Sequence, residues 1–331
     1  MITNNCNNII ELEHGGGGYK SWEIIKEIRR ILTYTGKWKY SQDDGAVFPL
    51  GAKQNLVFTT DAFIVDPIFF PGGDIGKIAV SGTINDIAVM GAKPLGIALS
   101  LVIEEGFPKK DLNRILKSIE EVARTAKVPI VTGDTKVTEK GKIDKIEITT
   151  AGVGLAEKII INSGAQPGDV IITSGDLGEH TIALLSRRFK YVTKIKSDAK
   201  PLNLELGRVA PYLHACKDPT RGGLSANLVE IALKSKVKVI LDEDKLPYKK
   251  AVVAVAELLG LDIFSLASEG RFIAAVAARE ANKVLTILKR YNRNAKVIGA
   301  VYRGRGVYLR TKLGNLRPIQ MPRGKLIPRI C

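Results

Sequence analysis

The order of apolar segments along the chain constrains the fold most, because strand-like and helix-like patterns alternate. Strand-like runs at 55–65, 95–103 and 146–155 are separated by helical patterns that begin at Asp74 and Pro108. Residues 128–131 form a further short run, which leads into a turn-like Gly-Asp-Thr-Lys. Because helices placed between strands cover the faces of a sheet, this order predicts a mixed α/β (α+β) domain.

A second series of the same kind follows the turn-rich segment 162–168, so we expect a second α/β domain. The last stretch has three prolines, two glycines and no helical period, which predicts an extended tail. The expected divisions are an N-terminal segment with a glycine-rich loop at 1–40, an N-terminal domain at 41–160, a C-terminal domain at 161–312 and a flexible tail at 313–331.

Composition excludes several classes of protein. The 331 residues are 45% hydrophobic and 25% charged, which is typical of globular chains. No apolar run approaches the roughly 18 to 20 residues that span a membrane, and residues 1–8 lack the apolar core of a secretion signal. We therefore expect a cytoplasmic protein. The net charge of +16 is scattered, without a basic block or interleaved aromatics, so we expect no nucleic acid as partner.

Aspartates are the candidate metal ligands. With three scattered cysteines and three histidines, a bound metal should be a hard cation held by carboxylates. Asp86 lies in an otherwise apolar helical pattern, where a buried carboxylate costs several kcal/mol unless a cation or donors compensate it. Together with the other aspartates at strand and helix ends, it could hold Mg²⁺; the alternative is that each aspartate only caps a helix or turns the chain. These other aspartates are Asp43, Asp44, Asp61 and Asp134.

Three further segments and the terminal cysteine can carry chemistry. The glycine run 15–18 could bring backbone N–H groups to phosphate, although it matches neither the Walker nor the Rossmann pattern and could be a linker. Segments 218–223 and 268–271 could bind an anion or supply a base, or could be plain turns and ion pairs. The terminal Cys331 follows Arg329, which we expect to favour the thiolate. Its tail of about 18 residues could reach roughly 60 Å, but a terminal cysteine can also be incidental.

Taken in order, these motifs resemble the HypE family of hydrogenase maturation factors, in the aminoimidazole ribonucleotide synthetase superfamily. The likeness covers nearly the whole chain from Ile9 onward. It is carried by Leu-Glu-His-Gly at 12–15, Asp-Asp-Gly-Ala at 43–46, Thr-Thr-Asp at 59–61, Phe-Pro-Gly-Gly-Asp-Ile-Gly at 70–76, Asn-Asp at 85–86, Ile-Glu-Glu-Gly-Phe-Pro at 103–108, Val-Thr-Gly-Asp-Thr-Lys-Val at 131–137, Asp-Pro-Thr-Arg-Gly-Gly at 218–223, Ser-Glu-Gly-Arg at 268–271 and Pro-Arg-Ile-Cys at 328–331. Gly16 departs from the usual His-Gly-Ala-Gly-Gly, which adds flexibility and removes no chemistry.

The resemblance implies two PurM-like α/β domains and a homodimer formed through the N-terminal domains. It also implies an ATP-dependent carbamoyl dehydratase, a lyase that acts on its own C-terminal cysteine. The partner HypF would place a carbamoyl group on Cys331, and dehydration to a thiocyanate would supply the cyanide ligand for the iron of nickel–iron hydrogenase. The HypC–HypD complex would receive the cyanide.

The resemblance also implies roles for individual residues, with ATP and Mg²⁺ as cofactors. Cys331 would carry the reacting group, Glu269 is our first choice for the base and Asp86 the second, and Lys136 would steady phosphate charge or orient the amide. The expected nucleotide contacts are Asp43, Asp44, Thr60, Asp61, Asp74, Asp134, Gly16 and Gly17. The expected Mg²⁺ ligands are Asp44, Asp61, Asp86, Asp134 and Asp218.

Two other functional classes stay open on the sequence. One is an ATP-using relative in the superfamily that acts on a free aminoimidazole, thiamine phosphate or selenide, in which Cys331 would be dispensable. The other is a non-catalytic scaffold for maturation partners, which would turn over no ATP.

Overall fold

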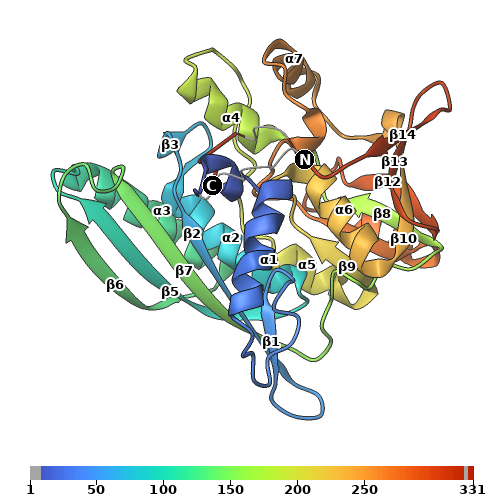
Figure 1. The fold of residues 1–331 in the computed structure, drawn as a ribbon, viewed down its shortest axis with the longest axis horizontal. Helices are drawn as coiled ribbons and strands as arrows, with labels where there is room; N and C mark the ends of the chain where they lie inside the picture. Colours follow the sequence, from blue (N-terminus) through green and yellow to red (C-terminus); the bar gives the residue numbers. More distant parts are fainter. Residues whose placement is uncertain (1–8, 324–326) are drawn as a thin grey trace, which may run out of the picture.

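The computed structural model describes residues 9–323 and 327–331. Residues 1–8, on which the expected absence of a secretion signal depended, and residues 324–326 of the tail lie outside the described residues. The chain forms two halves, each built on one main sheet with helices packed against it (Figure 1). The α/β prediction is therefore confirmed. None of the described helices is both long enough and apolar enough to cross a membrane.

The N-terminal half is built on a five-stranded sheet in the order β1-β2-β7-β5-β6. Only β5 and β6 run parallel, and the other neighbours are antiparallel. The strands are β1 (Ala46–Pro49), β2 (Asn55–Phe63), β5 (Lys93–Glu104), β6 (Ile130–Thr138) and β7 (Ile146–Ala156), with a small hairpin of β3 (Phe69–Phe70) and β4 (Gly73–Asp74). The helices of this half are η1 (Leu12–Gly15), α1 (Tyr19–Ile31), α2 (Ile75–Val89) and α3 (Lys109–Ala126).

Strand β6 corrects the sequence prediction of a short strand followed by a turn. Gly133 and Asp134 lie inside the strand, paired with Leu99 and Ser100 of β5. The β-branched residues of this segment favour an extended backbone, and the parallel ladder with β5 continues it to Thr138.

Helix α2 is the central element of the molecule. Asp74 caps its N-terminus by accepting a hydrogen bond of 3.0 Å from the backbone N–H of Lys77. All residues of α2 except Lys77 and Asp86 are buried, because the helix packs against the N-terminal sheet, α3 and helix α5 of the other half. A helix that is apolar all round is expected in such a position, and its acid Asp86 must face a polar space.

The C-terminal half is built on a seven-stranded sheet in the order β14-β13-β10-β12-β8-β11-β9. Helix α6 belongs to the apolar core on one face, and α5 and α8 belong to the core on the other. The strands are β8 (Asp169–Thr173), β9 (Leu213–Lys217), β10 (Val237–Asp242), β11 (Ile273–Ala277), β12 (Lys296–Arg303), β13 (Gly306–Arg310) and β14 (Leu316–Ile319). The helices are α4 (Glu179–Arg188), α5 (Asn203–Val209), α6 (Gly223–Ser235), α7 (Lys250–Leu258) and α8 (Ala281–Leu288), with short 3-10 turns η2 (Ala210–Tyr212), η3 (Glu243–Lys245), η4 (Ile263–Ser265) and η5 (Ala278–Glu280).

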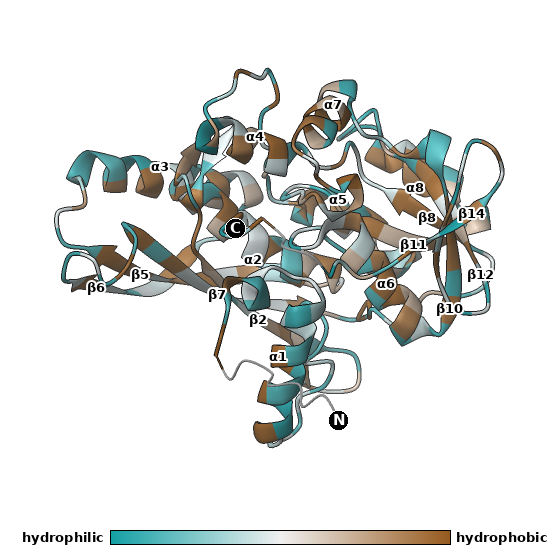
Figure 2. Cartoon of the chain, turned by 45° about the horizontal axis from the view of Figure 1, so that its top comes forward, coloured by the Kyte–Doolittle hydropathy of each residue, from teal (hydrophilic) through white to brown (hydrophobic). Residues whose placement is uncertain are grey.

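The two faces of the N-terminal sheet differ. Helices α2 and α3 lie on one face, whereas none of the helices that the structure describes covers β5, β6 and β7 on the other (Figures 1 and 2). Along β2 the residues alternate, with Val57 and Thr59 buried and Phe58 and Thr60 exposed. This uncovered surface is called the open face below.

The first part of the predicted tail is a strand. Strand β14 pairs antiparallel with β13 at the edge of the C-terminal sheet. The last residues then return to the junction of the two halves, where both views place the C-terminus beside α2 (Figures 1 and 2). The terminal residue therefore lies in the middle of the molecule.

Candidate active site

A cavity of about 950 Å³ lies between the two halves of the chain. Its walls come from α1, the segment before β1, strand β2, helix α2 and the segment that follows β9. Cys331 also lines it, so the tail ends inside the cavity. Residues expected to act together from the sequence therefore face one space, among them Asp43, Asp44, Thr60, Asp61, Asp86, Asp218, Glu269 and Cys331.

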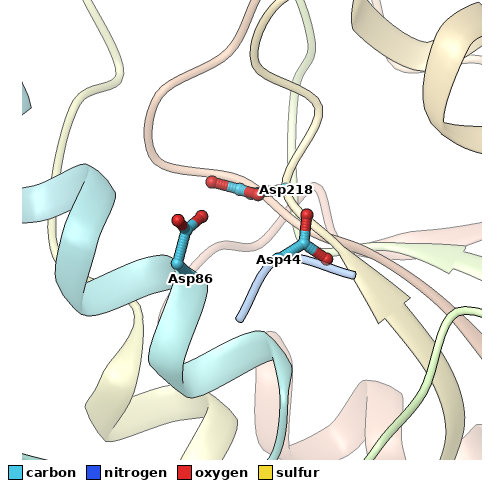
Figure 3. A group of neighbouring side chains, drawn as sticks. All are labelled: Asp44, Asp86 and Asp218. Carbon is cyan, nitrogen blue, oxygen red and sulfur yellow. The ribbon is translucent and has the colours of Figure 1, made fainter. Parts of the chain in front are cut away.

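Three aspartates converge at the base of this cavity. Asp44 comes from the segment before β1, Asp86 from α2 and Asp218 from the end of β9 (Figure 3). One carboxylate oxygen of each lies within 4.8 Å of the others. Burial and mutual repulsion raise the pKa of the Asp86 carboxyl well above its usual value, and burial beside Asp44 raises the pKa of Asp218 to about 7.

The donor set suits a hard divalent cation. Asp61 lines the same cavity. Burial is the largest cause of the raised pKa of Asp86, and the charge of Asp61 is the second largest. Carboxylate oxygens are ligands that Mg²⁺ prefers. A bound cation would also compensate the negative charge that these clustered acids share. Thr59 Oγ1 lies 2.9 Å from Asp86 Oδ2 and 2.9 Å from the Asp44 carbonyl oxygen, which fixes the spacing of the two acids.

A buried ion network joins the two halves beside the aspartates. Lys217 Nζ lies 2.6 Å from Asp44 Oδ1 and 3.2 Å from Glu230 Oε2. Lys234 Nζ lies 2.5 Å from Glu230 Oε1 and 2.8 Å from Asp43 Oδ1. Since Asp43 and Asp44 belong to one half and the other partners to the second, the network holds the halves in register. Asp43 is thus occupied by its ion pair with Lys234.

Glu269 is held in place by hydrogen bonds of its backbone. Its backbone N–H donates to Asp198 Oδ1 over 3.1 Å, and its carbonyl accepts from Asn85 Nδ2 over 3.3 Å. The residue is 1% exposed, and its Oε1 has no hydrogen-bond partner among the described residues. Burial, followed by the charge of Asp218, raises the pKa of the carboxyl well above its usual value. When ionised, a carboxyl in such a place binds a proton more tightly than an exposed glutamate does.

The Cys331 thiol lines the same cavity as Glu269 and Arg221. Burial raises the pKa of this thiol, and the nearby charge of Glu269 adds to the rise while Arg221 opposes it. The expectation that Arg329 would favour the thiolate is wrong, because its guanidinium hydrogen-bonds to Asp144 instead. Local sequence placed the two residues close together, but the extended tail turns the arginine away. In the docked tail, burial thus favours the neutral thiol over the thiolate.

The glycine run is ordered against the segment 218–223. Gly17 has a φ of +82°, and a Cβ there would lie 2.4 Å from Arg221 Cβ. A side chain at this position would therefore force Arg221 away from the cavity. Gly17 lines the cavity and its N–H donates to Ser21 Oγ over 2.8 Å, whereas Gly16 is not part of the lining.

Within one chain, several expected site residues lie elsewhere. Asp74 is committed to capping α2 and does not line the cavity. Asp134 and Lys136 lie on the edge strand β6, with side chains 66% and 75% exposed, and pair with each other at 3.5 Å. Alternation along β6 places both on the open face, because their partners Ser100 and Val102 alternate with the buried Leu101 of β5.

Sequence reasoning missed Thr59 and Lys217. Thr59 precedes the predicted Thr60 and Asp61, and the alternation of β2 turns it toward α2. Lys217 ends the buried strand β9 directly before Asp218, and a lysine that closes an apolar run beside a predicted ligand could have indicated an ion pair. Its charge is retained because Asp44 and Glu230 raise its pKa against the effect of burial.

Comparison with known proteins gives consistent matches over both halves. Residues 42–156 match the N-terminal domain of AIR synthase related proteins, and residues 166–312 match the C-terminal domain. A carbamoyl dehydratase HypE of Cupriavidus necator is 44% identical over 333 aligned residues, covering 97% of this chain and 95% of the relative. A putative hydrogenase expression/formation protein of Methanocaldococcus jannaschii is 46% identical, covering 96% of this chain and 98% of the relative.

Solved structures give the same picture. A crystal structure of a HypE–HypF complex contains a chain that superposes with a TM-score of 0.85 at 39% identity, covering 90% of this chain and 99% of that one. A HypE crystal structure in complex with ATP superposes with a TM-score of 0.81 at 35% identity, covering 98% of this chain and 100% of that one.

Proposed function

This chain belongs to the HypE family of carbamoyl dehydratases, and from that premise we propose that it uses ATP to dehydrate a carbamoyl group on its own Cys331 to a thiocyanate. The observation that carries the proposal is that the Cys331 thiol lies in one cavity with three converging aspartates and with Glu269, whose buried Oε1 has no hydrogen-bond partner in the part of the chain that the structure describes. The thiocyanate carbon and nitrogen become the cyanide ligand for the iron of nickel–iron hydrogenase.

The reaction removes one oxygen and two protons from the carbamoyl group. An amide oxygen is a poor leaving group, and ATP, when bound, supplies the phosphoryl group that lets it depart as phosphate. The amide nitrogen must lose both protons as the C≡N bond forms. Glu269 is the residue that accepts a proton there, because it lines the cavity close enough for its charge to act on Cys331, and its raised pKa makes the ionised carboxylate more basic. Arg221, beside Cys331, offers positive charge to the developing anion.

Mg²⁺ is the cation we propose for the aspartate cluster. Asp44, Asp86 and Asp218 would hold it, with Asp61 beside them, and the cation would neutralise the charge of the bound triphosphate. Lys217 already compensates part of the charge of Asp44, so the uncompensated charge lies on the other two members.

Binding of this cation should depend on pH. The folded protein without metal holds a proton on Asp218 up to about pH 7, whereas the unfolded chain releases it near the ordinary aspartate pKa of 3.8. The metal-free fold therefore loses stability as pH rises from about 4 to 7. Because Mg²⁺ competes with that proton, we expect the Mg²⁺-induced rise in Tm to be larger at about pH 8 than at about pH 6.

Thermal unfolding with and without Mg²⁺ at several pH values measures this difference. In Asp218→Asn the Mg²⁺ effect should be smaller, and its pH dependence should be weaker, with only the protons of the other two aspartates left to compete. Equal Mg²⁺ shifts at low and high pH in the unmodified chain would contradict the assignment of Asp218 as a ligand.

HypF is the proposed donor of the carbamoyl group. A neutral, buried thiol is a poor nucleophile, so Cys331 should receive the group while the tail is outside the cavity and then return to it. The solved HypE–HypF complex is a structure of a similar chain with such a partner. We propose the HypC–HypD complex as the acceptor of the cyanide.

A homodimer is proposed through the open face of the N-terminal sheet. Apolar side chains on this face include Phe58 of β2, which is 37% exposed, and Val102 of β5, which is half-buried. A second copy would remove them from water, and an edge strand open to solvent favours such association. The same packing would carry Asp134 and Lys136 of one subunit toward the Thr60 side of the cavity in the other. The expected roles of these two residues then belong to the partner's site.

Mass spectrometry of the C-terminal peptide tests the reaction. After incubation with HypF, carbamoyl phosphate, ATP and Mg²⁺, the peptide ending in Cys331 should gain one carbamoyl group and then lose one water. The peptide with the buried Cys216 should stay unchanged. Persistence of the carbamoyl group with ATP present, or ATP turnover only with a free small molecule, would contradict the proposal.

A further inference from the structure

We propose that His180 and Arg188, at the two ends of α4, form a latch that fixes the register of the tail and so positions Cys331 in the cavity. Neither side chain lines the cavity, and both bind the tail through its backbone. The latch deepens the proposed function, because it rests on dehydration taking place at the docked cysteine.

His180 holds the last peptide unit. Its Nε2 lies 2.8 Å from the Ile330 carbonyl oxygen, and its Nδ1 lies 2.8 Å from Ser197 Oγ. Ser197 Oγ also accepts from the Ala199 N–H at 3.1 Å, so the hydroxyl proton points to Nδ1. The proton of the neutral ring then sits on Nε2 and is donated to Ile330. Burial lowers the pKa of His180, which favours this neutral form.

Arg188 holds Pro328 and Arg329, the two tail residues before Ile330. Its Nη1 donates to the Pro328 carbonyl at 3.0 Å and its Nη2 to the Arg329 carbonyl at 3.0 Å. Its Nε donates to the Asp66 carbonyl at 2.9 Å, and the Asp66 N–H donates to Arg329 O at 3.2 Å. The guanidinium thus bridges the tail and the segment after β2 with fixed geometry.

Together these hydrogen bonds bind three successive carbonyl oxygens of the tail. Because they contact only the backbone, they fix the register of the tail along α4 whatever its side chains are. The Ile330 side chain adds an apolar anchor, buried to 7% exposure in the core shared by α2, α3 and α4. A slip of one residue would move the thiol by about 3.3 Å and expose the isoleucine. His180 and Arg188 are therefore positioning residues for the thiol.

Thiol labelling tests the latch without relying on the reaction. Cys331 should react with a maleimide roughly tenfold faster in Arg188→Met and His180→Leu than in the unmodified chain, since each change removes one or two hydrogen bonds that hold the tail backbone. His180→Gln retains an amide donor and should restore slow labelling. Arg187→Met, a change at the exposed neighbouring arginine, is the matched control and should leave the rate unchanged. Mass spectrometry of the C-terminal peptide gives the rate for Cys331 alone.

A second measurement separates the latch from the proposed chemistry. With HypF and ATP, the latch variants should take up the carbamoyl group as fast as the unmodified chain but dehydrate it roughly tenfold more slowly. If the unmodified chain never dehydrates the group, the proposed function fails while the labelling contrast still stands. Equal labelling of Cys331 in Arg188→Met, Arg187→Met and the unmodified chain, all with matching Tm, would overturn the latch.

Discussion

Glu269→Gln should slow thiocyanate formation on Cys331 by about 10²–10⁴-fold, the range that a positioned general base contributes. Glutamine keeps the shape of the side chain and the two backbone hydrogen bonds that Glu269 makes with Asp198 and Asn85. It removes only the basic oxygen, which has no hydrogen-bond partner among the described residues. Burial makes a charged carboxyl costly at this position, and glutamine carries no charge. We therefore expect the change to cause no loss of stability.

Single-turnover mass spectrometry of the carbamoylated protein measures this rate, and ATP binding is followed by calorimetry. The variant should accumulate the carbamoyl form and bind ATP as before. Glu121→Gln on the exposed surface of α3 is the matched control and should react at the normal rate. Complete conversion in Glu269→Gln would remove Glu269 from the mechanism.

Lys136→Ala should reduce dehydration by about 10²–10³-fold, the loss expected when one charge-stabilising contact to the reacting group is removed. In a single chain this result has no explanation, because Lys136 is exposed on β6 and does not line the cavity. It follows if the open faces of two chains pack together and each cavity receives Lys136 from the partner. Lys127→Ala, at the exposed end of α3, is the control and should leave the rate of dehydration unchanged.

Mixed dimers give the decisive form of this experiment. Co-expression of Lys136→Ala chains with Glu269→Gln chains forms mixed dimers in which one cavity has both residues intact. Random pairing should then recover about a quarter of the normal activity, although each variant alone is nearly inactive. Absence of recovery in verified mixed dimers would place Lys136 and Glu269 in the same chain's site or remove Lys136 from the reaction.

The sequence predicted the secondary structure well where periodicity is long and regular. Helix α2 begins at its predicted aspartate cap, and α3 begins after Pro108 as expected. Short elements were missed, among them β1, α5 and β9, because a run of a few residues has no periodicity of its own. The extension of β6 was missed for a related reason, since the Gly-Asp pair indicates a turn until the ladder with β5 continues through it.

What the sequence determined by itself is the set of local rules: alternating patterns that require two α/β halves, an acid within an apolar helix, and an ordered series of motifs that identifies the family. The tertiary structure alone decided which side chains meet. Asp44, Asp86 and Asp218 converge only because α2 is buried between the two halves, and Cys331 reaches Glu269 only because the tail crosses back over α4. Hydrophobic periodicity acts between neighbours a few residues apart, whereas these contacts depend on packing between segments that lie tens of residues to more than a hundred residues apart in the sequence, which no local pattern encodes.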